Sequence, residues 1–339
     1  MTDLINRQWL LTRRPVGEAS PADFTLSESA FSVPQLRAGQ VVVKNEIFLL
    51  APTIRNWLDA PGNNFYPSIP LGDPILSPAG GTVIASADAR FPVNSQVSAI
   101  SSWQDYEVLD TTERSVRPVP PHASLVEAMG PLGMNALTAY FGLRRIGAPE
   151  VGDTLLVSGA AGSAGSIAAQ IGKIMGARVV GIAGGPEKCD WLLSECGLDA
   201  AIDYKEGSLT QQVAAACPEG VDVFFDNVGG ATLQSAVDVM NRFGRIVLCG
   251  QIAGYGGSAP IPGPENMMRF IYGSIRMQGF LLADYEAELI EGWDQLRAWL
   301  DAGLLAHRED VRSGFDTIPH AFPALFDGSN HGTLLVTAD

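Results

Sequence analysis

The 339-residue sequence is short of positive charge and of long apolar runs. Only 22 residues are Lys or Arg against 37 Asp or Glu, and the formal net charge of −15 argues against nucleic acid or an anionic membrane as partner. No apolar run approaches the roughly 18 residues of a membrane span, and the stretch MTDLINRQWLLTRRP lacks a signal-peptide core. We therefore expect a cytoplasmic protein that acts on a small molecule.

Cysteine and histidine are also scarce, and neither is clustered. The four cysteines are Cys189, Cys196, Cys217 and Cys249, and the four histidines are His122, His307, His320 and His331. None of them forms a C-x-x-C or H-x-x-x-H pair, and no cysteine precedes residue 189. A disulfide framework and a zinc site are therefore not expected, and we predict no metal.

The pattern of residue types along the chain changes near residue 130. The first part is rich in Pro and Gly, with short β-type runs such as Gln40–Phe48 and Gln96–Ile100, which favours a compact and mostly β domain. Strand-like and helical stretches then alternate, an order that indicates βαβ units and a parallel sheet with helices on both faces. The strands are expected at Thr154–Ser158, Arg178–Ala183, Ala200–Asp203, Val221–Asp226 and Gly244–Cys249.

The stretch VSGAAGSAGSIAAQ, from Val157 to Gln170, reads as a strand end, a glycine turn and a helix start. Against the pattern G-x-G-x-x-G it has Ala160, Gly162 and Gly165, so alanine replaces the first glycine. Gly162 lets the backbone approach a pyrophosphate, and Gly165 lets the helix pack closely on the strand. The helix N-terminus offers free N–H groups to the phosphate, so we predict a dinucleotide site here.

The residues after the second strand of this region indicate which dinucleotide binds. An NAD site usually has Asp or Glu at that strand tip to hold the ribose 2′-OH, but this chain has Gly184 and Gly185. The missing carboxylate leaves room for a 2′-phosphate, and Lys188 can supply charge to it. Glu187 and Asp190 flank that lysine and weaken the local positive field. NADP(H) is the predicted cofactor.

Several motifs together resemble one known family. AAGSAGS, AGGPEK, DYK, FDNVGG and FGRIVLCGQIAGY occur in this order, after GPLGMNALTAYFGL at Gly130–Leu143. They look like the zinc-independent medium-chain dehydrogenase/reductases, in the leukotriene B4 dehydrogenase, prostaglandin reductase and alkenal reductase branch. The chain departs from that branch where APTIR (Ala51–Arg55) replaces D-P-Y-M-R, and where Thr333 replaces a lysine.

The resemblance implies an α/β protein of two domains. Residues 1–130, rejoined by 304–339, would form a mostly β GroES-like catalytic domain, and residues 131–303 a Rossmann domain. It further implies NADPH-dependent, zinc-independent reduction of the carbon–carbon double bond of α,β-unsaturated ketones or aldehydes, with hydride transfer to the β-carbon. A quinone or alcohol oxidoreductase on the same scaffold, and an NADPH-binding protein without turnover, remain the alternatives.

The resemblance also assigns roles to single residues. Tyr255 is the expected catalytic residue, as a hydrogen-bond donor to the enolate oxygen near the nicotinamide ribose. The expected cofactor-binding residues are Ala160, Gly162, Ser163, Gly165, Gly184, Lys188, Tyr204, Asn227, Cys249, Tyr255, Asn330, Met134 and Thr138. The expected substrate pocket includes Tyr66, Phe270 and Tyr272, although aromatic residues at such positions are equally common in a core. A homodimer is expected through the apolar segment Ile275–Leu282, read as an edge strand.

Overall fold

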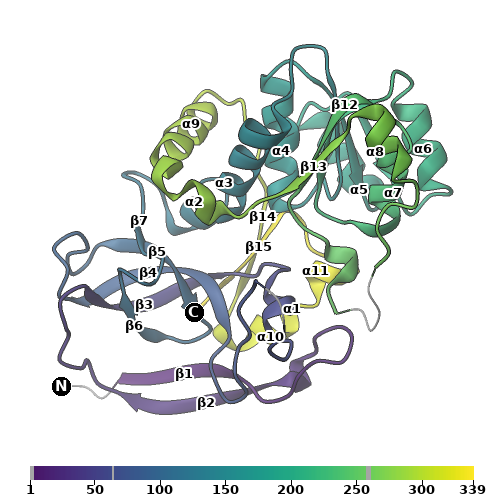
Figure 1. Ribbon diagram of the computed structural model, residues 1–339. Helices are drawn as coiled ribbons and strands as arrows, with labels where there is room; N and C mark the ends of the chain where they lie inside the picture. The colour runs from purple at the N-terminus through teal and green to yellow at the C-terminus, as the bar shows by residue number, and fades with distance from the viewer. Residues whose placement is uncertain (1–3, 63–64, 257–260) are drawn as a thin grey trace. The chain divides into compact units, whose positions relative to one another are not determined.

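The computed structural model describes residues 4–62, 65–256 and 261–339, which fold as two units (Figure 1). The first unit contains the described residues up to Met129 together with Glu309–Asp339, and the second is Gly130–Arg308. The boundaries expected from the sequence fall after residues 130 and 303, close to these divisions. None of the helices in the described segments combines the length and the apolar character needed to cross a membrane.

A six-stranded sheet forms the centre of the second unit. Its strands run in the order β10-β9-β8-β11-β12-β13, and every pair is parallel. Their bounds are β8 Thr154–Val157, β9 Arg178–Ala183, β10 Ala200–Asp203, β11 Val221–Asp226, β12 Met240–Leu248 and β13 Arg276–Gly279. The central strands are apolar and almost fully buried, which is typical of a parallel sheet covered on both faces. The predicted Rossmann sheet is confirmed, although β12 begins four residues before the expected Gly244.

Helices lie on both sides of this sheet (Figure 1). Those of the second unit are α3 Met134–Phe141, π-helix η2 Gly142–Gly147, α4 Ser163–Ile174, α5 Pro186–Ser194, α6 Leu209–Ala216, α7 Gly230–Val237, α8 Met268–Gly273 and α9 Leu289–Asp301, with 3-10 turns η3 Ile252–Gly254 and η4 Leu282–Glu288. Side chains of α6, α7 and α8 pack on one face, around Phe224 and Ile246. On the other face α4 approaches so closely that a Cβ at Gly172 would lie 2.3 Å from Leu155 Cδ2.

A mostly antiparallel sheet forms the first unit, in the order β14-β15-β3-β4-β5-β7, with β6 also paired to β3 and with β1 and β2 as a separate hairpin. Only β14 and β15 are parallel neighbours. The strands are β1 Leu4–Leu11, β2 Phe24–Phe31, β3 Gln40–Leu49, β4 Leu76–Ser86, β5 Gln96–Ser102, β6 Tyr106–Asp110, β7 Arg117–Pro118, β14 Glu309–Ser313 and β15 Thr333–Thr337. The short helices are η1 Pro21–Asp23, α1 Ile54–Trp57, α2 Leu125–Met129, η5 Phe315–Thr317, α10 Ile318–Ala321 and α11 Ala324–Asp327. The predicted GroES-like β domain is confirmed.

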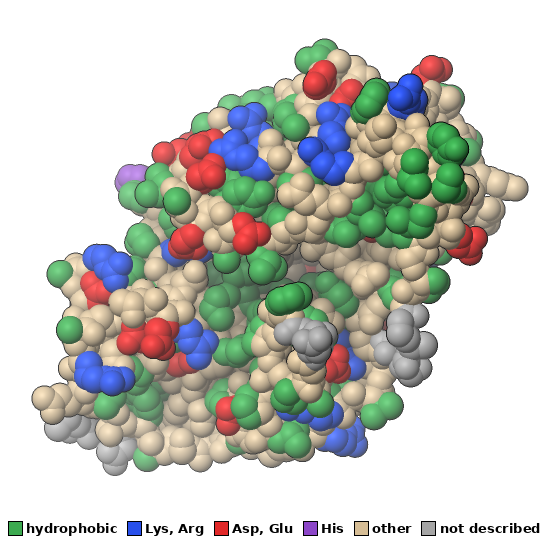
Figure 2. Space-filling view, viewed as in Figure 1, with side chains coloured by type: hydrophobic (Ala, Val, Ile, Leu, Met, Phe, Trp, Pro, Cys, Tyr) green, Lys and Arg blue, Asp and Glu red, His purple; other side chains and the backbone are tan. Residues whose placement is uncertain are grey.

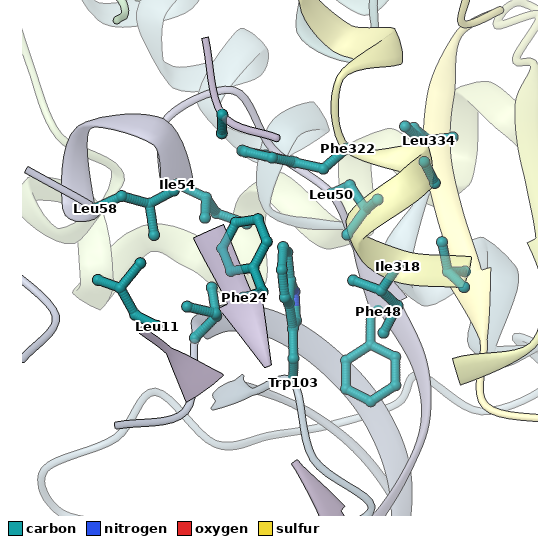
Figure 3. Close-up of a cluster of buried hydrophobic side chains, with 14 of the residues drawn as sticks. Leu11, Phe24, Phe48, Leu50, Ile54, Leu58, Trp103, Ile318, Phe322 and Leu334 are labelled. Atoms are coloured by element: carbon teal, nitrogen blue, oxygen red, sulfur yellow. The ribbon is translucent and has the colours of Figure 1, made fainter. Parts of the chain in front are cut away.

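Trp103 is at the centre of the core of this first unit (Figure 3). Its indole is fully buried, with the rings of Phe24 and Phe322 centred 5.4 Å and 5.7 Å away. Phe322 comes from the C-terminal return of the chain, so the two sequence-distant parts of the unit share one core. Aromatic pairs at such distances add to the free energy of burial, by about 1 kcal/mol each.

Candidate cofactor site of the parallel sheet

The glycine turn after β8 is closed by a hydrogen bond within its own backbone. Gly159 has a φ of +58°, and its carbonyl oxygen accepts a hydrogen bond from the Gly162 amide at 3.0 Å. A Cβ at Gly165 would lie 2.2 Å from that same oxygen. No side chain can therefore be present at residue 165 unless the turn itself changes, which is why this spacing of glycines is needed.

Helix α4 starts directly from this turn. Gly162 is its N-cap residue and carries no side chain that could satisfy the first amides, which have no acceptor one turn earlier. Ser163 is the first helical residue, and its hydroxyl oxygen accepts from Asn135 Nδ2 at 2.6 Å. The exposed amides and the helix dipole make this helix start suited to a phosphate, as the sequence predicts.

The turn after β9 is shaped by a tyrosine from the next strand. A Cβ at Gly184 would lie 2.8 Å from Tyr204 Cε1 and 2.9 Å from its hydroxyl oxygen. The Gly185 amide is held by Asp203 Oδ1 at 2.9 Å, so Asp203 is used by the backbone. A side chain at residue 184 would therefore require the Tyr204 ring to move. The strand tip itself presents no acidic residue to the ribose 2′-position of a dinucleotide.

Lys188 lies in the first turn of α5, two residues after the Pro186 that begins the helix. It is half-buried, and it supplies positive charge beside the Gly184–Gly185 turn. A strand tip with no Asp or Glu of its own, an Asp203 carboxylate occupied by backbone amides, and a nearby cation fit a 2′-phosphate. The residues of these two turns thus fit a phosphorylated dinucleotide.

A buried hydrogen-bond network links β8 and β11, the neighbouring strands where the direction of winding of the sheet reverses. Ser158 Oγ donates to Asp226 Oδ1 at 2.7 Å, and the amides of Val228 and Gly229 donate to the same oxygen at 2.9 Å and 3.0 Å. Asp226 is fully buried, and burial raises the pKa of its carboxyl while these donors oppose that rise. The network fixes the loop that follows β11.

Asn227 is oriented by the same network. Its amide donates to Ser158 Oγ at 2.8 Å, and its side-chain Nδ2 donates to the Ser158 carbonyl oxygen at 2.7 Å. Sequence reasoning selected Asn227 but missed Ser158 and Asp226. The sequence signal for the two missed residues was a polar residue at the carboxyl end of each strand that flanks the switch point, where ligands of such sheets bind.

Cys249 and Tyr255 follow β12 at the same edge of the sheet. The Cys249 amide donates to the Asp226 carbonyl oxygen at 2.9 Å, and burial, aided by the Asp226 charge, raises the pKa of the Cys249 thiol to about 12. The Tyr255 hydroxyl accepts from the Gln251 amide at 3.2 Å. The role of Tyr255 as a hydrogen-bond donor to a substrate stays a prediction.

Comparison with known proteins gives full-length matches. A profile described as "N-terminal domain of oxidoreductase" matches residues 7–116, and one described as "Zinc-binding dehydrogenase" matches residues 164–300. The putative NADP-dependent oxidoreductase YfmJ of Bacillus subtilis is 39% identical, with 97% of each chain covered. The NADPH-dependent curcumin reductase of Escherichia coli is 33% identical over 98% of this chain and 96% of its own, and bovine prostaglandin reductase 1 is 34% identical over 98% and 99%.

This chain belongs to the medium-chain dehydrogenase/reductase superfamily, in the branch of the prostaglandin, alkenal and curcumin reductases. The crystal structure of CurA from Vibrio vulnificus in complex with NADPH is similar, with a TM-score of 0.91, 33% identity and coverage of 98% of this chain and 99% of that one. The predicted family is confirmed.

Two other expected cofactor-binding residues of this reductase lie on α3. Thr138 Oγ1 donates to the Met134 carbonyl oxygen at 2.8 Å, so the threonine hydroxyl proton is used within the helix. Both side chains are partly exposed. Their role toward a ligand stays a prediction.

The remaining expected residues of the reductase lie elsewhere. Asn330 and Tyr66 belong to the first unit, where Asn330 Nδ2 donates to the Gly332 carbonyl oxygen at 3.0 Å and Tyr66 is exposed. Phe270 of α8 packs against the core of the parallel sheet, while Tyr272 on the same helix is exposed. Among the residues that the structure describes, no group of three or more His, Cys, Asp or Glu is arranged to hold a metal ion.

Proposed function

We propose that the protein reduces the carbon–carbon double bond of α,β-unsaturated ketones or aldehydes, with NADPH as the reductant. The observation that carries this proposal is the full-length likeness to prostaglandin reductase 1 and to an NADPH-dependent curcumin reductase. The Gly184–Tyr204 contact supports it, because it keeps a carboxylate away from the position where NADPH carries its extra phosphate. The sheet therefore supplies a cofactor site of matching chemistry.

The chain's own residues divide the remaining work. When bound, NADPH supplies a hydride to the substrate β-carbon, and a proton then completes the reduction at the α-carbon. Tyr255 donates a hydrogen bond to the carbonyl oxygen, where negative charge builds up during the reaction. Asn227, held by Ser158, fixes the loop next to it.

The test is the rate of NADPH oxidation with an enone, an enal and a quinone, and the rate of NADP⁺ reduction with a secondary alcohol. Each assay is repeated with NADH or NAD⁺. We expect turnover of the enone and the enal, with a strong preference for NADPH. Turnover of the quinone alone, or oxidation of the alcohol with NADP⁺, would replace the proposal by one of the two oxidoreductase alternatives. Tight NADPH binding without turnover of any compound would indicate a binding protein.

Replacement of Tyr255 by Phe tests the donor. Loss of one hydrogen bond to a developing oxyanion lowers kcat by about 100-fold, with a smaller change in KM. The measurement is steady-state kinetics on the best enone, with the affinity for NADPH measured separately. A kcat equal to that of the wild type would assign the donor role to another group.

We also propose a homodimer formed through β13. This strand is at the edge of the parallel sheet, and all four of its residues are exposed. Figure 2 shows hydrophobic side chains gathered over α8. Met268, Ile271 and Tyr272 of that helix and Met277 of β13 are exposed. The strand is shorter than the expected Ile275–Leu282, because the 3-10 turn η4 begins at Leu282. An open strand edge beside exposed apolar side chains favours pairing with a second copy.

Sedimentation equilibrium at micromolar concentration tests the dimer. Two chains per particle are expected, and Met277→Glu should shift the particle toward one chain because it places charge on the edge. Thr210→Glu, on α6 away from that edge, is the matched control. A wild-type monomer would refute the dimer.

A further inference from the structure

The last residues of the second unit, 305–308, are held by a buried glutamine of α4. Gln170 is 2% exposed; its Nε2 donates to the Ala306 carbonyl oxygen at 2.8 Å, and its Oε1 accepts from the Ala306 amide at 2.6 Å. A side chain that pairs with both the N–H and the C=O of one residue fixes that residue in place. Leu305 beside it is buried, so the segment has a defined position on the Rossmann unit.

Two residues further on, this segment brings Arg308 to helix α5. Arg308 Nη2 donates to Glu187 Oε1 at 3.3 Å, and Glu187 is the residue immediately before Lys188 in the first turn of that helix. The side chains are 38% and 66% exposed, and an exposed pair of this kind adds little to stability. The pair matters for its location, because it brings a second cation, Arg308, beside the helical turn that carries Lys188.

The charges of this turn explain why a second cation is needed. Lys188 alone is offset by the neighbouring Glu187 carboxylate, so the pair has no net charge toward an incoming anion. Asp190 also flanks Lys188, so Arg308 adds a needed second positive charge, and a guanidinium is suited to phosphate oxygens because it can donate two parallel hydrogen bonds. Tyr204 lies against Gly184, and residue 184 itself contributes no acidic side chain.

We propose that Arg308 is a second cationic residue that recognises the 2′-phosphate of NADPH, and that Gln170 positions it. The proposal rests on the proposed NADPH dependence and adds to it a residue from the chain's return segment, more than 100 positions away from the βαβ motif that carries the rest of the site. Glu187 then acts as a competitor, which holds the guanidinium in the absence of ligand and releases it to the phosphate.

The experiment measures direct binding by calorimetry and needs no substrate. The probes are 2′,5′-ADP, which carries the 2′-phosphate, and 5′-AMP, which lacks it. Arg308→Gln should weaken 2′,5′-ADP about tenfold and leave 5′-AMP unchanged. Glu187→Gln should strengthen 2′,5′-ADP, because the competing carboxylate is gone. Gln170→Leu, which keeps the volume but removes both hydrogen bonds, should lower the preference for 2′,5′-ADP in part.

Lys173→Gln is the matched control. It removes one positive charge from an ion pair, with Asp199, at the opposite end of α4 and should leave both affinities unchanged. An equal loss of 2′,5′-ADP affinity in Arg308→Gln and Lys173→Gln would mean that only net charge matters, and it would overturn the proposal. Unchanged 2′,5′-ADP binding in Arg308→Gln, or weaker binding in Glu187→Gln, would also overturn it.

Failure of the proposed function gives a different result. If the wild type binds 2′,5′-ADP no more tightly than 5′-AMP, and Lys188→Gln changes neither, then the NADPH dependence itself is wrong. If the wild type prefers 2′,5′-ADP and Lys188→Gln reduces that preference while Arg308→Gln does not, then only the role of Arg308 is refuted.

Discussion

The carboxyl edge of the parallel sheet has two halves that are built differently. In the half formed by β8 and β9, glycines leave space, and the ligand would meet backbone amides and a few charges. In the half formed by β8, β11 and β12, Ser158, Asp226 and Asn227 fill the space with hydrogen-bonded side chains. The first half is shaped by the missing side chains of its glycines and the second by buried, hydrogen-bonded side chains. Substitutions in the two halves should therefore have different effects.

The largest effect is expected at Gly165. Alanine there places a Cβ 2.2 Å from the Gly159 carbonyl oxygen, a backbone atom that cannot rotate away. We expect a loss of about 3 kcal/mol in the free energy of unfolding and loss of tight NADPH binding, measured by thermal unfolding and by calorimetry. Gly263→Ala, where a Cβ meets nothing within 4 Å, is the control. Normal NADPH binding by Gly165→Ala would show that the turn can open at little cost.

The next effect concerns cofactor choice at Gly184. Here the obstacle is a side chain, Tyr204, so it can be removed: Gly184→Asp combined with Tyr204→Ala places a carboxylate at the strand tip. We expect the ratio of kcat/KM for NADPH to that for NADH to fall by about tenfold or more, because a carboxylate repels the 2′-phosphate and accepts from a ribose 2′-OH.

Gly184→Asn with Tyr204→Ala has the same shape without the charge and separates the two causes. If both double variants change the ratio equally, then it is the volume at residue 184 that selects the cofactor.

In the buried half a smaller loss is expected. Ser158→Ala removes the hydroxyl donor of Asp226 and the acceptor of the Asn227 amide, which leaves buried polar groups unpaired. We expect a loss of about 1–3 kcal/mol in the free energy of unfolding, seen in denaturant titrations. Ser235→Ala removes an equally buried hydroxyl from α7 and should have less effect. Equal losses for the two variants would show that the network has no special role.

The smallest effect concerns Cys249. Because burial raises the pKa of its thiol to about 12, the reactive thiolate is present at roughly one part in 10,000 at pH 8 and rises tenfold for each pH unit up to that pKa. Modification by a disulfide reagent should therefore be slow at pH 8 and become faster at alkaline pH, and Cys249→Ser should leave the rate at pH 8 unchanged. Rapid modification of Cys249 at pH 8 would contradict the dry environment of this half.

The same difference determines how far the site could be predicted from the sequence. The glycine half was predictable because glycine adopts a φ of +58° without steric cost and because no Cβ fits 2.2 Å from a backbone oxygen. Gly159 and Gly165 therefore indicate the turn. The β8 to β11 strands were predictable from their apolar runs. Ser158 and Asp226 were not, because a serine or an aspartate at a strand end is equally consistent with a solvated loop, and only the pairing of β8 with β11 brings the two together.

Long-range placement accounts for what else was missed. Arg308 is one arginine in a polar stretch, and nothing local to it indicates α5; the contact depends on Gln170, 136 positions earlier in the chain than Ala306. The antiparallel pairing of β15 with β3 likewise depends on a partner far along the chain. The local sequence pattern determines which residues form a helix or a strand, whereas long-range packing determines which elements lie beside one another.

One strand determines when the first unit can complete its fold during synthesis. β15, at Thr333–Thr337, lies between β14 and β3, and Leu334, Leu335 and Val336 are buried in the first unit. Domains generally fold as units while synthesis proceeds at about 5–20 residues per second. The N-terminal unit is begun first, but its sheet lacks an interior strand until residues 333–337 have been synthesised. For that interval the edge of β3 at residues 47–49 has no β15 to pair with.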